Sequence, residues 1–139
     1  MNTNKLITAG LIGSVVAFIL GWIIWGNLLT GIMGEYSGTA SGVMRGEEEM
    51  LWLPLILGHL GLGFLLAIIY ERWATISTFA TGAKAGAVIG LLVSFANNMI
   101  MLGTTHLMQP TGAIIDILAS VVSMGITGGV VGWWLGRGK

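Results

Sequence analysis

The sequence predicts an all-α membrane protein, a four-helix transmembrane bundle in a single integral membrane domain spanning residues 1–139. Hydrophobic residues make up 55% of the chain and charged residues only 9%, whereas soluble domains carry roughly a quarter charged residues. Apolar residues gather in four runs, at about 6–33, 50–72, 80–105 and 111–135. Each run reaches the ~20 residues that a spanning helix needs. Strands with open edges cannot cross a bilayer, so we expect helices.

The first run exceeds the length that a bilayer requires, so its helix is expected to tilt or to extend into the interface. Lys5 precedes this run, and a secretory signal peptide is therefore a competing interpretation. The run is too long for a typical signal-peptide core, and no A-x-A-like cleavage site closes it, which favours an uncleaved helix.

The second run follows three carboxylates, Glu47, Glu48 and Glu49. These suit the positive end of a helix dipole, and a cation site is the alternative. Pro54 lies in or near the first turn, where its missing N–H does least harm. Thr111 is a candidate N-cap for the fourth run.

Small residues at four-residue spacing form a strip on each of several runs. On a helix such a strip occupies one face and lets a second helix approach closely, as in membrane helix pairs. The predicted helix-packing residues are Gly13, Ala17, Gly21, Gly86, Gly90, Ser94, Gly128 and Gly132.

A weak internal repeat relates the first and third runs. The pair Ile12-Gly13 and the residues after it match Ile89-Gly90 and its followers at one constant offset. The match predicts two parallel-repeated helical hairpins. Convergent small-residue patterns are the alternative.

The basic residues predict the orientation. Arg45 falls on one side of the membrane, and the other side holds both termini and Lys5, Arg72, Lys84, Arg137 and Lys139. By the positive-inside rule, we expect both termini to face the cytoplasm.

Five polar residues are expected within the bilayer, where such groups are costly and normally face the bundle interior. They are Asn27, Asn97, Asn98 and Asp116 in the outer half, and His59 near the midplane. In one interpretation they only form interhelical hydrogen bonds; in the other they line an outward-facing pocket for a cation or small polar solute. Trp22 and Trp25 either fill space opposite glycines or form the wall of such a cavity.

Enzyme signatures are missing from the sequence. It has no cysteine, no H-E-x-x-H or G-x-S-x-G motif, and no paired carboxylates inside the apolar runs. We therefore expect no catalytic residue, no metal site and no cofactor. The formal net charge is zero and basic residues do not cluster, which argues against nucleic acid as a partner.

Three segments carry a resemblance to a known family: the first-run segment from Ala17 to Gly26, Gly86-x-x-x-Gly90, and the closing segment Gly128–Trp133. In these the chain resembles small, uncharacterised four-helix bacterial membrane proteins, grouped as a domain of unknown function. The resemblance implies a multi-pass protein of the bacterial cytoplasmic (inner) membrane, with no established activity.

Two functions are compatible with the sequence. The small-residue rows favour a non-catalytic protein that acts through helix–helix assembly in the lipid bilayer, as a homo-oligomer or as an accessory subunit of a membrane-protein partner. The alternative is a small transporter-like or channel-like protein with the polar pocket described above.

Overall fold

Four helices of the computed structural model are long and apolar enough to cross a membrane, which indicates a membrane protein. The structure describes residues 2–138. The first helix combines α1 (Thr3–Ile23) with a π-helical turn, η1 (Ile24–Leu28), and a short helix, α2 (Thr30–Glu35), follows. The second combines α3 (Trp52–Ile68) with the π-helical η3 (Ile69–Ala74), preceded by the 3-10 turn η2 (Glu47–Glu49). The others are α4 (Phe79–Thr104) and α5 (Pro110–Gly136).

Two local features differ from the sequence-based expectation. The first run is not one regular helix, because the N–H of Leu29 reaches the carbonyl of Ile24 at 2.8 Å and widens the turn. The second difference concerns Thr111, which does not cap α5: the N-cap is Gln109. Proline needs no N–H partner at the first helical position, so the helix starts at Pro110, two residues earlier than a cap at Thr111 would place it.

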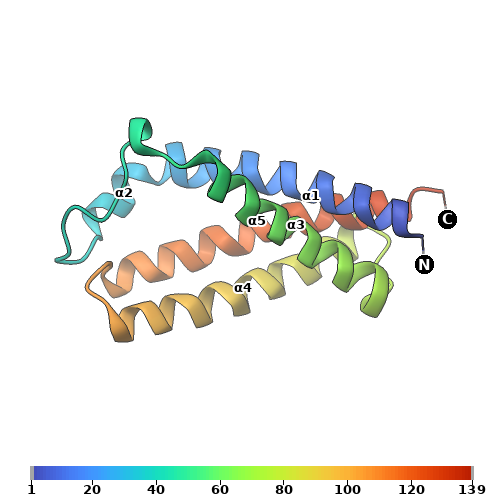
Figure 1. Cartoon of the computed structure of the whole chain (residues 1–139). Helices are drawn as coiled ribbons and strands as arrows, with labels where there is room; N and C mark the ends of the chain where they lie inside the picture. The colour runs from blue at the N-terminus through green and yellow to red at the C-terminus, as the bar shows by residue number, and fades with distance from the viewer. Residues whose placement is uncertain (1, 139) are drawn as a thin grey trace.

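Both chain termini lie at the same end of the molecule (Figure 1), here called the terminal end; the opposite end is the distal end. α4 and α5 pack along their lengths, and α1 packs on both α3 and α5. Glycines allow these approaches. A Cβ added to Gly90 would lie 2.6 Å from the Cβ of Met124, and one added to Gly86 would lie 3.1 Å from the Cα of Gly128.

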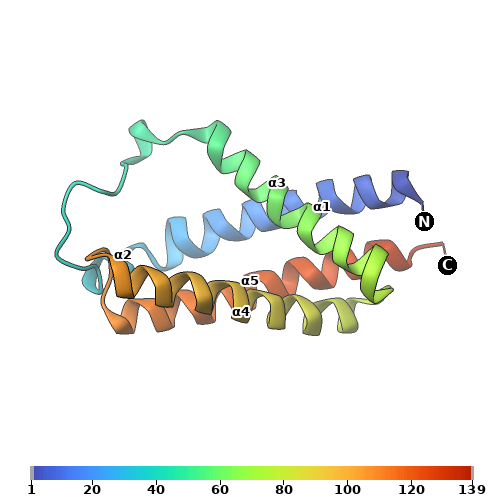
Figure 2. The same cartoon turned by 60° about the horizontal axis from the view of Figure 1, so that its bottom comes forward.

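The buried core lies toward the terminal end. It contains Leu66, Tyr70, Val131 and Leu135 from the last turns of the second and fourth spans, together with Ala9 near the start of α1. Within α3 the buried residues are Gly63, Leu66 and Ala67, all in its second half. Toward the distal end α3 diverges from α1, α4 and α5 (Figure 2).

A short backbone pairing organises the distal end. The N–H groups of Gly38 and Ala40 donate to Leu107 and His106, at 3.0 and 3.1 Å, and the N–H of Gln109 donates to Tyr36. The chain leaving α2 is thereby fixed to the turn between α4 and α5. This pairing holds the distal end of the first span beside α5.

Candidate functional site

Asp116 of α5 accepts a hydrogen bond at each carboxylate oxygen, and the two donors come from different spans. The indole Nε1–H of Trp25 in η1 donates to Oδ1 at 2.7 Å. The side-chain Nδ2 of Asn98 in α4 donates to Oδ2, also at 2.7 Å. We call these three residues the Asp116 cluster. Both donors are neutral side chains.

The amide of Asn98 is held from two directions. Its side chain is only 1% exposed, and Nδ2 donates to the backbone carbonyl of Ser94 at 2.9 Å as well as to Asp116. Rotating the amide by half a turn would set Oδ1 against two acceptors, so this orientation is the favourable one. Among residues 2–138, no partner is found for the buried Oδ1 of Asn98.

The π-helical turn positions Trp25. Wide turns of this kind shift the register of a helix and are frequent at functional sites. Here the side chains of Asn27 and Thr30 donate to the carbonyls of Trp22 and Trp25, at 2.8 and 3.1 Å. Local side chains therefore stabilise the turn that presents the indole to Asp116.

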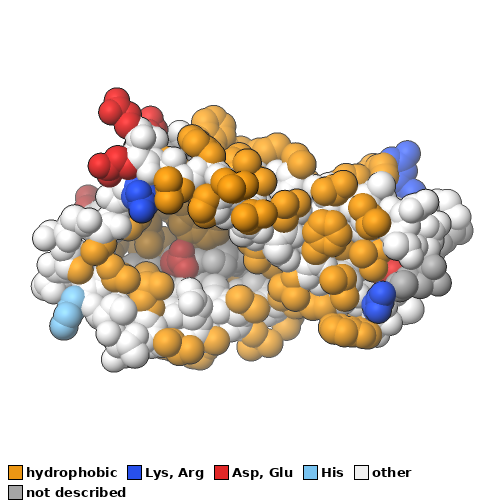
Figure 3. Space-filling view, in the orientation of Figure 1, with side chains coloured by type: hydrophobic (Ala, Val, Ile, Leu, Met, Phe, Trp, Pro, Cys, Tyr) orange, Lys and Arg blue, Asp and Glu red, His pale blue; other side chains and the backbone are white. Residues whose placement is uncertain are grey.

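The Asp116 cluster lies close to the distal ends of its helices. Asp116 follows the start of α5 by six residues, and Asn98 precedes the end of α4 by six. Each is therefore about 9 Å from its helix end at 1.5 Å per residue. Asp116 is half-buried rather than enclosed. On the face shown in Figure 3 the molecule is hollowed between the helices, with an acidic side chain inside the hollow.

The other predicted pocket residues make different contacts. Asn27 is exposed and bonds within its own turn, and Asn97 is exposed on α4. His59 approaches the carbonyl of Leu55 through Nδ1, at 2.7 Å. Its ring also meets Phe18 edge-on, with 5.2 Å between centroids. A hydrogen bond joins Asn98 and Asp116, whereas within residues 2–138 no hydrogen bond links Asn27, Asn97 or His59 to either of them.

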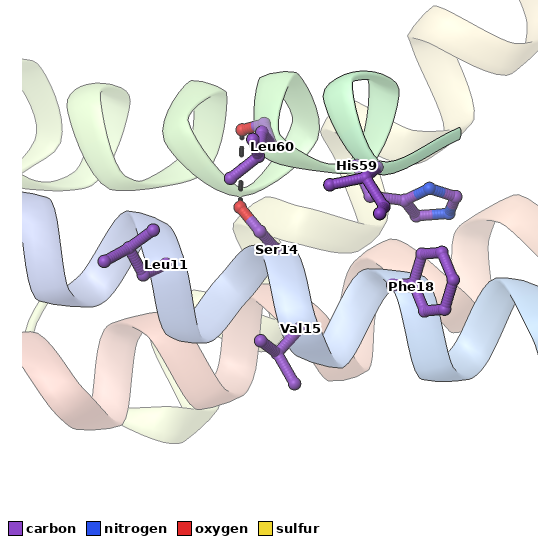
Figure 4. A pocket seen from close by; sticks show the side chains of 7 residues that line it. Leu11, Ser14, Val15, Phe18, His59 and Leu60 are labelled. Atoms are coloured by element: carbon purple, nitrogen blue, oxygen red, sulfur yellow. Dashed lines mark hydrogen bonds between the residues drawn. The ribbon is translucent and has the colours of Figure 1, made fainter. Parts of the chain in front are cut away.

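A cavity of about 280 Å³ adjoins His59 between α1 and α3 (Figure 4). A Cβ on Gly21 would lie 2.8 Å from Nε2 of His59, so this glycine gives the ring room. The surroundings are mainly apolar, which suits a hydrocarbon chain better than a polar solute. The lining residues are Leu11, Ser14, Val15, Phe18, Ile56, His59 and Leu60.

Most of the predicted helix-packing glycines contact neighbouring helices of the same chain. Gly13 faces Gly63 and Val131, while Gly86 and Gly128 approach each other. Gly90 faces Met124 and Ser120. The rows on α4 and α5 are therefore occupied within one copy of the chain.

Trp25 is the member of the Asp116 cluster that is not among the five predicted polar residues; the sequence left open whether it fills space opposite glycines or forms the wall of a cavity. The sequence does indicate that both residues lie toward the distal end: Trp25 is three residues from the end of its span at Leu28, and Asp116 is six residues from the start of α5. A carboxylate inside an apolar span needs a hydrogen-bond donor. Without knowledge of the π-helical turn, the sequence could not show which way the indole points.

Within the described residues, 2–138, no three His, Cys, Asp or Glu side chains gather closely enough to hold a metal ion.

The chain matches no protein-family model, and no curated protein and no solved structure is significantly similar to it.

Proposed function

We propose that this chain is a small, non-catalytic, transporter-like or channel-like membrane protein that takes a cation or small polar solute at its distal end. The observation that carries the proposal is Asp116, a carboxylate in an apolar span whose hydrogen-bond donors, Trp25 and Asn98, are both neutral. Ionisable groups inside membranes are costly and commonly mark solute or ion pathways.

A purely structural role for the Asp116 cluster is the competing interpretation. Interhelical hydrogen bonds in membranes contribute about 0.6 kcal/mol on average, enough to fix helix register. Buried polar atoms in a structural network are normally all paired. The unpaired Oδ1 of Asn98 and the half-exposed Asp116 support a site that is completed by something else.

The proposed topology places both termini in the cytoplasm of a bacterial cell, so that the distal end faces outward. The basic residues Lys5, Arg72, Lys84 and Arg137 all belong to segments near the terminal end, and this distribution supports the orientation. The family resemblance supports the bacterial inner membrane.

We also propose that the four spans form one bundle built from two repeated hairpins. The packing of α1 on α3 and of α4 on α5 supports this pairing. The divergence of α3 then makes the bundle open at the distal end.

The test is flux through proteoliposomes that contain the purified full-length protein. Uptake of cations and small polar solutes should exceed that of protein-free vesicles and should fall in Asp116→Asn. Asn97→Ser, an exposed amide next to Asn98, is the matched control and should retain uptake. Unchanged flux in Asp116→Asn would contradict the proposal.

Assembly is the second candidate function, and one observation favours it. Gly58 and Gly61 lie near the middle of α3, on the distal side of its buried residues, and a Cβ on either would meet nothing within 4 Å. Exposed small residues on a membrane helix allow another helix to pack closely. Gly58→Leu combined with Gly61→Leu should then abolish an oligomer or a co-purifying subunit in native nanodiscs. A lone monomer in the wild-type protein would contradict assembly.

A further inference from the structure

We propose that Arg137 and Lys5 bind the phosphate of one anionic phospholipid at the terminal end, where the start of α1 meets the end of α5. This inference does not depend on the proposed function, because the Asp116 cluster lies toward the opposite end of α5. Its evidence is an exposed guanidinium that lies on two indole rings, a second cation fixed beside it, and an excess of basic over acidic residues at this end.

The guanidinium of Arg137 lies on an aromatic platform. Its Cζ is 5.0 Å from the ring centroid of Trp133 and 4.9 Å from that of Trp134. Such contacts hold an arginine by the face of its guanidinium and leave the N–H groups at the edge available. Among residues 2–138, the hydrogen bonds of Arg137 involve its backbone alone. The N–H edge of this exposed side chain can therefore receive an anion.

Lys5 supplies a second positive charge at the same place. Its Nζ donates to the backbone carbonyl of Arg137. One turn further along α1, the hydroxyl of Thr8 accepts a hydrogen bond from the indole Nε1–H of Trp134 at 3.2 Å. These two bonds fix the start of α1 against the end of α5. An ammonium group carries three N–H donors, so Lys5 keeps two for a ligand.

The two cations lie at the depth of the lipid headgroups. α5 has 27 residues and is therefore about 40 Å long, so that it extends about 5 Å beyond each side of a hydrocarbon core of ~30 Å. Arg137 directly follows α5, and Lys5 is the third residue of α1. The indole of Trp133, about one turn before the end of α5, then lies at the boundary where tryptophan is enriched.

The charge of the terminal end favours an anionic lipid over a zwitterionic one. The basic residues described at this end are Lys5, Arg72, Lys84 and Arg137, whereas the acidic residue described there is Glu71 (Figure 3). A lipid with a net negative charge is attracted by this excess, and basic groups at the membrane surface bind such lipids. A zwitterionic lipid would bring a further positive charge to the same place. Arginine is also the side chain that matches the oxygens of a phosphate in two parallel hydrogen bonds.

The surface below the two cations suits the acyl chains of the lipid. Trp133 is 50% exposed on α5. On α1, the exposed side chains that follow Lys5 toward the middle of the span include Leu11, Val15 and Ile19. A phospholipid contacts both the cations and this apolar surface, whereas free phosphate contacts the cations alone. The combination therefore favours a lipid as the occupant.

Native mass spectrometry of the full-length protein, released from nanodiscs with equal amounts of phosphatidylglycerol and phosphatidylcholine, tests the site. We expect one phosphatidylglycerol to stay bound in preference to phosphatidylcholine. Arg137→Gln and Lys5→Gln should each weaken its binding about tenfold or more, as the loss of a hydrogen bond to a charged group does. Arg72→Gln is the matched control, because it removes the same charge from an exposed arginine of η3 at the same end. It should retain the lipid.

Three results would overturn the proposal: equal retention of the two lipids, no retained phosphatidylglycerol, or a loss in Arg72→Gln as large as in Arg137→Gln. The wild-type comparison decides even if a variant does not fold. Inorganic phosphate added in excess distinguishes the two sources of the ligand. Unchanged retention of phosphatidylglycerol would support a lipid site, whereas its displacement would show that the cations take free phosphate instead.

Discussion

The hydroxyl of Tyr70 donates a hydrogen bond to the backbone carbonyl of Gly82 at 2.6 Å, and so joins η3 to the first turns of α4. Tyr70 is fully buried, beside Leu66 and Leu135. This hydrogen bond holds the second span against α4 at the terminal end. At the distal end, α3 diverges from the other helices (Figure 2). The Asp116 cluster therefore lies at the open end of a molecule that is held together at the other.

Tyr70→Phe removes this bond while keeping the ring. We expect the free energy of unfolding to fall by about 0.6–1.7 kcal/mol, between the average and the largest contribution measured for interhelical hydrogen bonds in a membrane protein. Unfolding by SDS in mixed micelles measures the change. Tyr36→Phe, in the distal connection, is the control, and an equal loss there would argue against a specific contribution of the Tyr70 bond.

Gly90→Leu should destabilise the α4–α5 pair. A Cβ at this position would already lie 2.6 Å from the Cβ of Met124, so a leucine must force the backbones apart, at a cost of about 1–3 kcal/mol. The loss of folded protein is measured by thermal denaturation followed by size-exclusion chromatography.

The matched control is Gly103→Leu on the same helix, where a Cβ would meet nothing within 4 Å. It should be nearly silent, and so should Leu91→Val at an exposed position. Normal folding of Gly90→Leu would show that α4 and α5 do not pack through these glycines.

Neighbouring amides give a second matched pair. Asn98→Leu removes two hydrogen bonds from a buried position and should cost about 1–3 kcal/mol, because Asp116 then loses a donor. Asn97 is exposed, so Asn97→Leu should be neutral or stabilising in lipid. Denaturation of the two variants in the same bilayer compares them. A larger loss of stability in Asn97→Leu than in Asn98→Leu would contradict the conclusion that Asn98 is the buried, hydrogen-bonded amide and Asn97 the exposed one.

Two tryptophans test the indole bond. Trp25→Phe removes the donor to Oδ1 of Asp116 and should lower stability by about 1 kcal/mol, within the range for membrane hydrogen bonds. Trp22 is 61% exposed, and Trp22→Phe should change little. A double-mutant cycle between Trp25→Phe and Asp116→Asn measures the coupling directly. Additive effects would mean that the two side chains do not interact.

The sequence predicted the four helices and the closely packed glycine strips because both follow from local patterns: apolar length and four-residue spacing. It also placed Asn98 and Asp116 near each other in depth. It could not reveal the π-helical turn, which depends on side chains such as Asn27 bonding backbone carbonyls. The turn decides that Trp25 reaches Asp116 and that Asn27 does not. The position of His59 against Phe18 likewise depends on how α3 crosses α1.

The sharpest test of a water-accessible distal site uses one engineered thiol, because the natural chain contains no cysteine. Asp116→Cys is treated in sealed, oriented vesicles with a membrane-impermeant cationic methanethiosulfonate, and Leu118→Cys, at an exposed apolar position of the same helix, is the control. We expect rapid modification of Asp116→Cys from the distal side only, and none of Leu118→Cys. An Asp116→Cys thiol that stays unmodified, or that reacts only from the terminal side, would contradict the proposed distal site.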